Sequence, residues 1–353
     1  MLTCWPALWI EESPMDRVKV LCTLRFTEEQ LDKLRAVSPR LAVEQVTCHN
    51  DEEVAQALDE TVEVLYTSAR YVNFPLEVAP NLRWVQFHSA GVDRVIGTPL
   101  WESDIAFTTT SGIHATPIAE YVFASILAFN RRIPRMLHDQ RRHEWPKGRW
   151  DLFAGPELRG QTMGIVGYGS IGREVGRLAR AFGMRVLATK RRVEERRDTD
   201  YELPATGDRE GTVPDQIFPP SRLKEMLALS DFVVIAVPLT PETEGLIGEE
   251  ELRAMKPNAY LVNVARGRIV VEAALIRALQ EGWIAGAGLD VFEREPLPLD
   301  SPLWDLENVI LSPHVAGFTI HYDERATDLF AENLRRYLAG EPLLNLVDKE
   351  RGY

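Results

Sequence analysis

Residues 163–192 read MGIVGYGSIGREVGRLARAFGMRVLATKRR. A short apolar run comes first, and a turn with glycines in the spacing G-x-G-x-x-G follows. A helix-forming run then leads to a second apolar run. The glycine spacing alone is a weak signal, but this order is typical of the first βαβ unit of a dinucleotide-binding fold. The stretch therefore predicts a parallel sheet that binds a nucleotide at one edge.

The three glycines would have separate tasks in such a unit. Gly167 would make the tight turn, Gly169 would let the backbone approach a pyrophosphate, and Gly172 would let the helix pack on the strand. Ser170 and Ile171 open the helix, where free N–H groups and the helix dipole favour an anion. A glycine-rich turn that binds no ligand is the alternative.

The second apolar run ends in three cations, Lys190, Arg191 and Arg192. An NAD site usually has an Asp or Glu here, about 20 residues after the glycines, to bind the ribose hydroxyls. Lysine and arginine suit a 2′-phosphate instead, so we predict that NADP(H) is preferred over NAD(H). Solvated surface charges are the alternative, and the neighbouring Glu194 and Glu195 could neutralise part of the patch.

Length and charge bound the remaining possibilities. The chain has 353 residues, 45% of them hydrophobic, and a formal net charge of −13. The length favours two domains, and the acidic balance argues against a protein that coats nucleic acid. Three cysteines, Cys4, Cys22 and Cys48, have neither disulfide nor zinc spacing, so we expect no metal site and a reducing compartment. No apolar run reaches membrane-spanning length, the amino terminus is too acidic for a secretory signal, and Met15 is an alternative start.

Two series of alternating strand and helix patterns run along the chain. The first series has expected strands at 19–24, 41–46, 62–67, 82–87 and 105–108, and helices from Thr27 to about Val37 and over 51–58. The second has expected strands at 163–166, 185–188, 232–237, 260–264, 286–290 and 309–312, and helices at 171–182, 223–228, 249–255 and 272–280. This rhythm predicts an α/β protein with two doubly wound parallel sheets.

A long helix near Pro117 links the two series, and a last helix is expected over 321–338. The last helix needs a partner surface, and the first series is the natural one. We therefore expect a domain of residues 1–118 and 315–353 into which a Rossmann domain, 119–314, is inserted. Residues 193–221 are rich in Pro, Gly and charge, and we expect a surface insertion that is partly mobile.

Three polar residues follow expected strands of the second series. Arg266 and His314 stand directly after strand ends, and Glu295 lies shortly after another. Ligands of open α/β sheets bind beyond the carboxyl ends of strands. Reduction of a 2-keto acid by hydride needs a cation for the carboxylate, which Arg266 can supply, and a proton donor, which His314 can be. Glu295 could hold the imidazole in its charged form. Each residue alone has a structural or solvated alternative.

The chain resembles the D-isomer-specific 2-hydroxyacid dehydrogenase family, in its glyoxylate and hydroxypyruvate reductase-like branch. The similarity rests on GIVGYGSIG, VPLTPETEGLI, NVARGRIVVEAALIRAL, GAGLDVFEREPLP and NVILSPHVAG, which span most of residues 85–320. The resemblance implies Arg266, Glu295 and His314 as the catalytic set. It also implies a flavodoxin-like substrate domain and reduction of a small 2-keto acid to the D-2-hydroxy acid with NAD(P)H.

The resemblance implies binding residues as well. Backbone amides of the substrate domain would bind the substrate carboxylate, from Ser89, Ala90, Gly91 and Val92. The nicotinamide pocket would be lined by Pro238, Ala265 and Asp290, with Asp290 near the carboxamide. The family also implies a homodimer joined through residues 119–155, which include Trp145 and Trp150. From the cysteines, the acidic charge and the lack of a membrane-length apolar run, we expect a cytoplasmic enzyme without nucleic-acid or membrane partners.

Two positions depart from the family pattern, and other functions stay open. His114 stands where Asn is frequent, and Tyr121 stands where His is frequent.

A nucleotide-sensing interaction protein, like the corepressors of this family, would keep the same three residues, and oxidation of phosphite is a third possibility. The sequence leaves the substrate and the physiological direction undecided. We expect the isolated His88 and His143 to be structural.

Overall fold

The computed structural model describes residues 17–352, so the expectations for Cys4 and Met15 lie outside the described residues. The chain divides into two units: Met1–Ile113 together with Ile320–Tyr353, and His114–Thr319. Residues 114–118 and 315–319, which we expected in the first domain, belong to unit 2. The physical reason at the first crossing is the long helix, which starts at Ala115 and so lies entirely in unit 2.

Unit 1 contains a five-stranded parallel sheet in the order β2-β1-β3-β4-β5, which is the flavodoxin order. Its strands are β1 (Val18–Cys22), β2 (Leu41–Gln45), β3 (Val62–Thr67), β4 (Trp84–Phe87) and β5 (Ala106–Thr108). Its helices are α1 (Glu28–Arg35), α2 (Asp51–Ala57), α10 (Tyr322–Ala339) and the short 3-10 helix η1 (Leu76–Val78).

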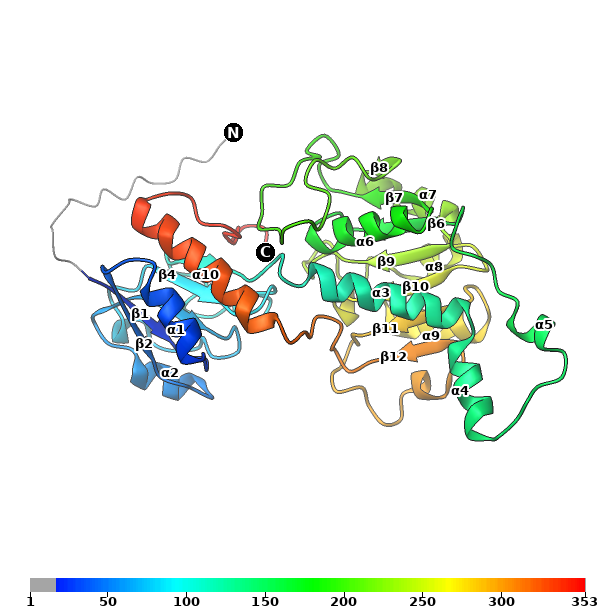
Figure 1. The fold of residues 1–353 in the computed structure, drawn as a ribbon, viewed down its shortest axis with the longest axis horizontal. Helices are drawn as coiled ribbons and strands as arrows, with labels where there is room; N and C mark the ends of the chain where they lie inside the picture. The colour runs from blue at the N-terminus through cyan, green and yellow to red at the C-terminus, as the bar shows by residue number, and fades with distance from the viewer. Residues whose placement is uncertain (1–16, 353) are drawn as a thin grey trace. The chain divides into compact units, whose positions relative to one another are not determined.

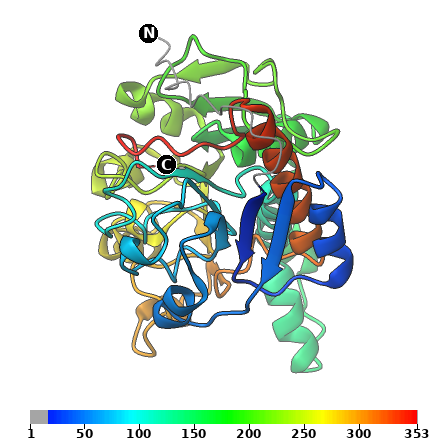
Figure 2. The same ribbon diagram turned by 90° about the vertical axis from the view of Figure 1, so that its left-hand side faces the viewer.

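Helix α1 begins where the sequence predicts. The Thr27 side chain accepts a hydrogen bond from the Gln30 backbone N–H, and the Gln30 side chain accepts one from the Thr27 N–H. This reciprocal cap satisfies two donors that a helix start leaves unpaired. Helices α1 and α10 then lie side by side on one face of the sheet, as Figure 2 shows in blue and red-orange, and Leu34 and Phe330 share one core.

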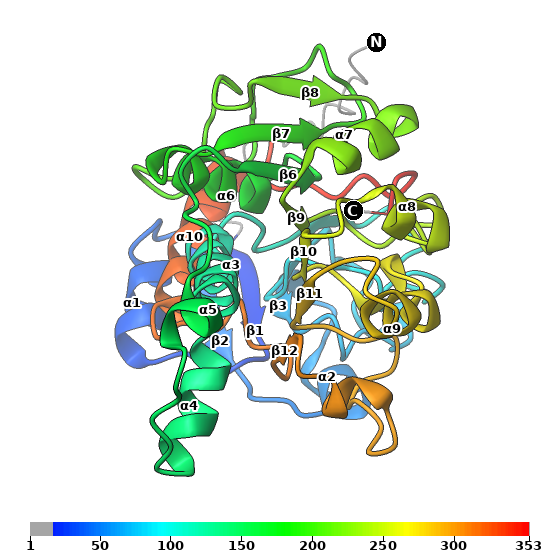
Figure 3. The same cartoon turned by 90° about the vertical axis from the view of Figure 1, so that its right-hand side faces the viewer.

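Unit 2 contains a seven-stranded parallel sheet in the order β12-β11-β10-β9-β6-β7-β8 (Figure 3). Its strands are β6 (Thr162–Val166), β7 (Arg185–Thr189), β8 (Gln216–Phe218), β9 (Phe232–Ile235), β10 (Tyr260–Asn263), β11 (Gly286–Leu289) and β12 (Val309–Leu311). The chain order reverses between β6 and β9, as in the Rossmann fold. The expectation of two doubly wound sheets is confirmed.

Helices cover both faces of this second sheet. They are α3 (Ala115–Asn130), α6 (Ser170–Ala181), α7 (Leu223–Leu229), α8 (Glu249–Ala254), α9 (Glu272–Gln280), and the 3-10 helices η2 (Pro220–Arg222), η3 (Gly267–Ile269) and η4 (Pro302–Asp305). Helices α3 and α6 run together on one face (Figure 1), with Val122 and Val175 in their common core. The polar stretch after α3 forms two helices that we did not expect, α4 (Ile133–Arg141) and α5 (Arg149–Phe153).

Residues 193–221 are built into unit 2 more firmly than their composition indicates. Strand β8 extends the sheet beside β7, and the buried Arg173 of α6 anchors the preceding loop. The Arg173 Nε atom lies 2.9 Å from Oδ2 of Asp198, and its Nη2 donates to the Arg196 carbonyl at 2.6 Å. Asp208 accepts hydrogen bonds from the Tyr168 hydroxyl and from backbone N–H groups. The expectation of a partly mobile insertion rested on a composition rich in Pro, Gly and charge, which does not show that several of these charges are partners of buried groups.

Within residues 17–352, no helix is both long and apolar enough to cross a membrane. Cys22 and Cys48 are buried free thiols.

Candidate active site

The polar residues singled out by the sequence gather at one edge of the unit 2 sheet. Arg266 follows β10, Glu295 follows β11, and His314 follows β12, and these three strands are neighbours. Because all strands of the sheet are parallel, the segments that follow them leave the sheet at the same edge. The glycine turn after β6 and Pro238 after β9 lie at this edge as well.

His314 and Glu295 are in direct contact. The Nδ1 atom of His314 lies 2.9 Å from Oε2 of Glu295, and the other carboxylate oxygen accepts the Phe292 N–H at 3.2 Å. Both side chains are partly exposed, at 48% for His314 and 37% for Glu295, so a small molecule can reach them. The carboxylate therefore orients the imidazole through Nδ1 and leaves Nε2 for another contact.

Asp290 holds the loop that carries His314. Its buried carboxylate accepts three hydrogen bonds, from the Ser312 hydroxyl at 2.5 Å, the Val315 N–H at 2.8 Å and the Ala316 N–H at 2.9 Å. These bonds surround His314, whose φ of 56° lies in the left-handed region that side chains rarely adopt. Sequence reasoning assigned Asp290 to the nicotinamide pocket and missed this anchoring, although an Asp and a Ser-Pro-His turn after adjacent strands were visible signals.

Tyr121 extends the same network. Its hydroxyl lies 2.6 Å from the Ser312 Oγ, and burial raises the pKa of this hydroxyl, which keeps it protonated. Helix α3 is thereby tied to the turn before His314. This position, at which the chain departs from the family pattern, contacts the loop that carries His314 through Ser312.

Two hydrogen bonds of the buried Asn263 side chain hold the turn that carries Arg266. The Asn263 side chain accepts the Ala265 N–H at 3.1 Å and donates to the Arg266 carbonyl at 3.0 Å. Gly267 is required next, because a Cβ atom there would lie 1.8 Å from the Phe292 carbonyl carbon. The backbone next to Arg266 therefore packs closely against the backbone of the segment that leads to Glu295.

The glycine turn has the geometry that a pyrophosphate needs. Gly167 has φ of +98°, and a Cβ atom there would lie 2.7 Å from the Ala236 carbonyl oxygen. A Cβ atom at Gly172 would lie 2.2 Å from the Gly167 carbonyl oxygen, so the helix packs closely on the turn. A Cβ atom at Gly169 would meet no atom within 4 Å, which leaves open space before Ser170 and Ile171. These residues fit a dinucleotide.

The three cations after β7 are partly engaged already. The Lys190 ammonium donates to the Glu195 carbonyl, and Arg192 pairs with the Glu195 carboxylate at 2.8 Å. Arg191 is exposed. Burial lowers the pKa of Lys190, and the nearby Arg173 adds to the effect. A phosphate bound here would have to replace these contacts to Glu195.

Residues 89–92 belong to unit 1 and follow β4. The Ser89 hydroxyl donates to the Gly91 carbonyl at 2.9 Å, while Val92 is buried in the unit 1 core and Ala90 is exposed. The segment is therefore a bend that is fixed at its buried end.

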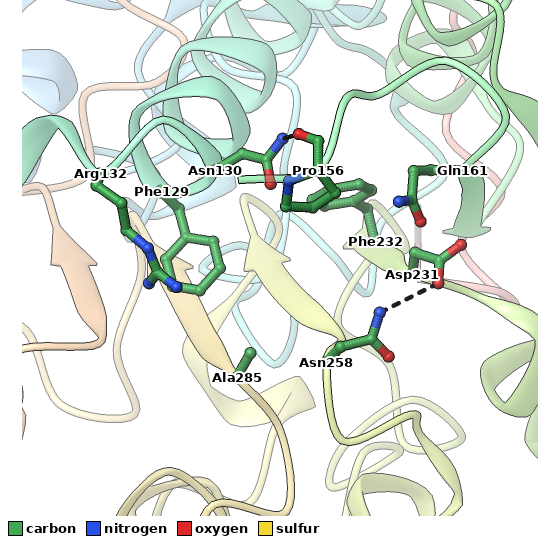
Figure 4. A pocket seen from close by; sticks show the side chains of 9 residues that line it. All are labelled: Phe129, Asn130, Arg132, Pro156, Gln161, Asp231, Phe232, Asn258 and Ala285. Carbon is green, nitrogen blue, oxygen red and sulfur yellow. Dashed lines mark hydrogen bonds between the residues drawn. The ribbon is translucent and has the colours of Figure 1, made fainter. Parts of the chain in front are cut away.

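A cavity of about 220 Å³ lies elsewhere in unit 2 (Figure 4). Gln161, Phe232 and Ala285 line it, and they stand at the amino ends of β6, β9 and β11, opposite the edge with the glycine turn. Two of its polar side chains already have partners, since Asn130 donates to the Pro156 backbone carbonyl at 2.6 Å and Asp231 accepts from the Lys256 ammonium at 2.8 Å. It is separate from the candidate site.

Comparisons with known proteins show the family and agree with the fold. Residues 123–316 match the model of the D-isomer specific 2-hydroxyacid dehydrogenase, NAD binding domain. The chain is 40% identical over 277 residues to a glyoxylate reductase of Thermofilum pendens, covering 78% of this chain and 77% of the relative. The chain belongs to the D-isomer specific 2-hydroxyacid dehydrogenase family. As a member, it is an NAD(P)-dependent oxidoreductase acting on CH–OH donors.

Solved structures show the same fold along most of the chain. A family protein from Aeromonas salmonicida has a TM-score of 0.78 and 29% identity, covering 94% of this chain and 99% of that one. An NADPH-dependent glyoxylate/hydroxypyruvate reductase from Sinorhizobium meliloti, solved with NADP and sulfate, has a TM-score of 0.76 and 27% identity and covers 96% and 100%.

Proposed function

We propose that this chain reduces a small 2-keto acid, such as glyoxylate or hydroxypyruvate, to the D-2-hydroxy acid with NADPH. The observation that carries the proposal is the 2.9 Å contact between His314 and Glu295 at the strand edge that also holds Arg266. The relatives named glyoxylate reductase support the substrate class.

The residues divide the work of reduction as follows. A dinucleotide bound at the glycine turn would supply the hydride for the carbonyl carbon. His314 donates a proton from Nε2 to the carbonyl oxygen, because Nδ1 faces Glu295. The Glu295 carboxylate stabilises the charged imidazole before transfer. Arg266 binds the substrate carboxylate and polarises the carbonyl, and backbone amides of residues 89–92 bind the carboxylate as well.

The proposed cofactor site uses residues of unit 2. The amino end of α6, from Gly169 to Gly172, would bind the pyrophosphate. Lys190, Arg191 and Arg192 would bind the 2′-phosphate, which is why we propose NADPH over NADH. Pro238, Ala265 and Asp290 would line the nicotinamide pocket, where Ala265 and Asp290 are buried.

We also propose that the chain is a cytoplasmic homodimer. Helices α4 and α5 expose a group of large apolar side chains: Ile133, Met136, Leu137, Trp150 and Leu152. Such a patch is typical of a protein interface, and Trp145 lies between the two helices. Analytical ultracentrifugation of the Met136→Asp, Leu137→Asp double variant tests this, since two charges in the interface should give a monomer where the native chain is a dimer.

A matrix of initial rates tests the reaction. NADH and NADPH are each combined with glyoxylate, hydroxypyruvate, pyruvate and a longer keto acid. We expect the highest kcat/KM for NADPH combined with glyoxylate or hydroxypyruvate. A chain that binds NADPH but turns over none of these acids would favour the corepressor-like interaction protein. Reduction of NADP with phosphite as the donor would favour the alternative of phosphite oxidation.

A further inference from the structure

Unit 1 contains a separate line of polar side chains that ends at residues 89–92. Tyr66 lies in β3, His88 directly follows β4, and Asp323 lies in the first turn of α10. The Tyr66 hydroxyl lies 2.8 Å from Nδ1 of His88. On the other side of the ring, Nε2 lies 3.5 Å from Oδ1 of Asp323. The imidazole thus bridges a buried hydroxyl and a carboxylate, immediately before Ser89.

The chemistry of Tyr66 determines which nitrogen of His88 carries the hydrogen. Tyr66 is fully buried, and burial raises the pKa of its hydroxyl well above the ordinary range. The protonated hydroxyl can donate to Nδ1, and in that arrangement Nδ1 accepts and the ring hydrogen lies on Nε2, which faces Asp323. Burial lowers the pKa of His88 and outweighs the opposite effect of Asp323. The neutral ring is the form that this site accommodates.

The main chain of His88 is held from three directions. Its N–H donates to the Thr67 carbonyl at 3.0 Å. Its carbonyl accepts hydrogen bonds from the Tyr322 hydroxyl at 2.6 Å and the Thr110 hydroxyl at 2.8 Å. The Tyr322 ring also packs on the imidazole, with centroids 4.7 Å apart. The start of the loop 89–92 is therefore set by the position of His88.

We propose that Tyr66, His88 and Asp323 form a positioning relay that holds residues 89–92 in their substrate-binding conformation, and that protonation of His88 releases it. The relay rests on the proposed function, in which residues 89–92 donate to the substrate carboxylate. A charged imidazole carries a hydrogen on Nδ1, which would face the Tyr66 O–H at 2.8 Å as a second donor. The buried hydroxyl would lose its acceptor, and the ring and the loop start would have to move.

The charged and titratable groups around the imidazole come from three elements. Tyr66 faces it from β3, and Tyr322 and Asp323 face it from α10. Cys22 of β1 stands opposite Tyr66 in the sheet register, and burial raises the pKa of its thiol to about 12, so the thiol stays neutral. Asp323 is thus the group here that favours the charged ring, and Tyr66 is the one that favours the neutral ring.

The Tyr66→Phe variant tests the relay through its pH dependence. Removing the hydroxyl removes the second donor that a charged His88 would face, so protonation no longer forces the ring and the loop start to move. In the native chain the KM for glyoxylate should rise about fivefold in the acid range, the equivalent of one hydrogen bond, and in the variant this rise should be lost. The KM for NADPH and the kcat above neutral pH should not change. If the acid limb remained, so that 1/KM for glyoxylate fell at the same acidic pH in the variant as in the native chain, the relay would be overturned.

A control and a direct readout separate the relay from a loss of packing. Tyr337→Phe removes another buried hydroxyl of unit 1, which donates to Glu63 at 2.5 Å, and should leave the acid limb in place. Nitrogen-15 NMR of the native chain should show neutral His88 with its hydrogen on Nε2. A hydrogen on Nδ1 would contradict the relay whatever the chain reduces, whereas the expected tautomer without any reductase activity would refute the proposed function alone.

Discussion

His314 Nδ1 lies 2.9 Å from Glu295 Oε2, and the two residues reach each other from the ends of the adjacent strands β12 and β11. The carboxylate fixes the ring through Nδ1 and leaves Nε2 to act on a substrate. Because Asp290 holds the backbone on both sides of His314, the imidazole is oriented by two carboxylates with different tasks. One faces the ring, and the other fixes the loop.

Glu295→Gln should lower kcat for keto-acid reduction while leaving the KM for NADPH unchanged. The amide can still accept a hydrogen bond from Nδ1, but it no longer stabilises the charged ring. We expect a decrease of about 10- to 100-fold, as when the partner that orients a metal-binding histidine is removed. Stopped-flow or steady-state kinetics measure it, with the exposed Glu293→Gln as the control. Equal kcat in both variants would remove Glu295 from the mechanism.

Arg266→Lys should lower kcat/KM for the keto acid. A lysine keeps the charge but cannot bind a carboxylate through two parallel N–H groups. The loss should be about 10- to 100-fold, since a hydrogen bond to a charged group contributes roughly 1.5–3 kcal/mol. Arg268→Lys is the matched control, because Arg268 pairs with Glu244 at 2.5 Å on the surface. The prediction fails if both variants bind and reduce glyoxylate like the native chain.

The lowered pKa of Lys190 predicts how NADPH binding depends on pH. Its pKa is lowered by burial, so it loses its charge at a lower pH than an ordinary lysine. The 2′-phosphate then loses a cation, and the KM for NADPH should rise as the pH increases into the alkaline range, while the KM for NADH should not. Lys190→Arg should abolish this rise, and Lys224→Arg, on an exposed ion pair, should not. An NADPH profile parallel to that of NADH would contradict the role of Lys190.

Arg173→Met should destabilise unit 2. Arg173 is 1% exposed and pairs with Asp198, so its removal leaves a largely buried carboxylate without its cation. Breaking such a pair costs about 3–5 kcal/mol, whereas an exposed pair contributes about 0–1 kcal/mol. Chemical denaturation should therefore separate Arg173→Met from Arg222→Met, which breaks the exposed pair with Glu225. Equal stabilities would mean that the loop around Asp198 is not anchored as described.

The sequence predicts the repeating elements because their signals are local. Strand 62–67 and helix 272–280 have the expected bounds, since each apolar pattern ends at a polar or glycine-containing turn. Residues that act through distant partners carry no such signal. Arg173 looks like one more helix cation in the sequence, and its burial depends on a loop more than 20 residues away. Asp290 and His88 likewise acquire their roles only when adjacent strands bring their partners together.

The most direct test of the central claim is the rate of NADPH oxidation by glyoxylate in the His314→Ala variant. A general acid contributes about 10²–10⁴-fold, so kcat should fall by that factor while fluorescence titration shows unchanged NADPH binding. A folded variant that keeps kcat within a few-fold of the native value would contradict the assignment of His314 as the proton donor.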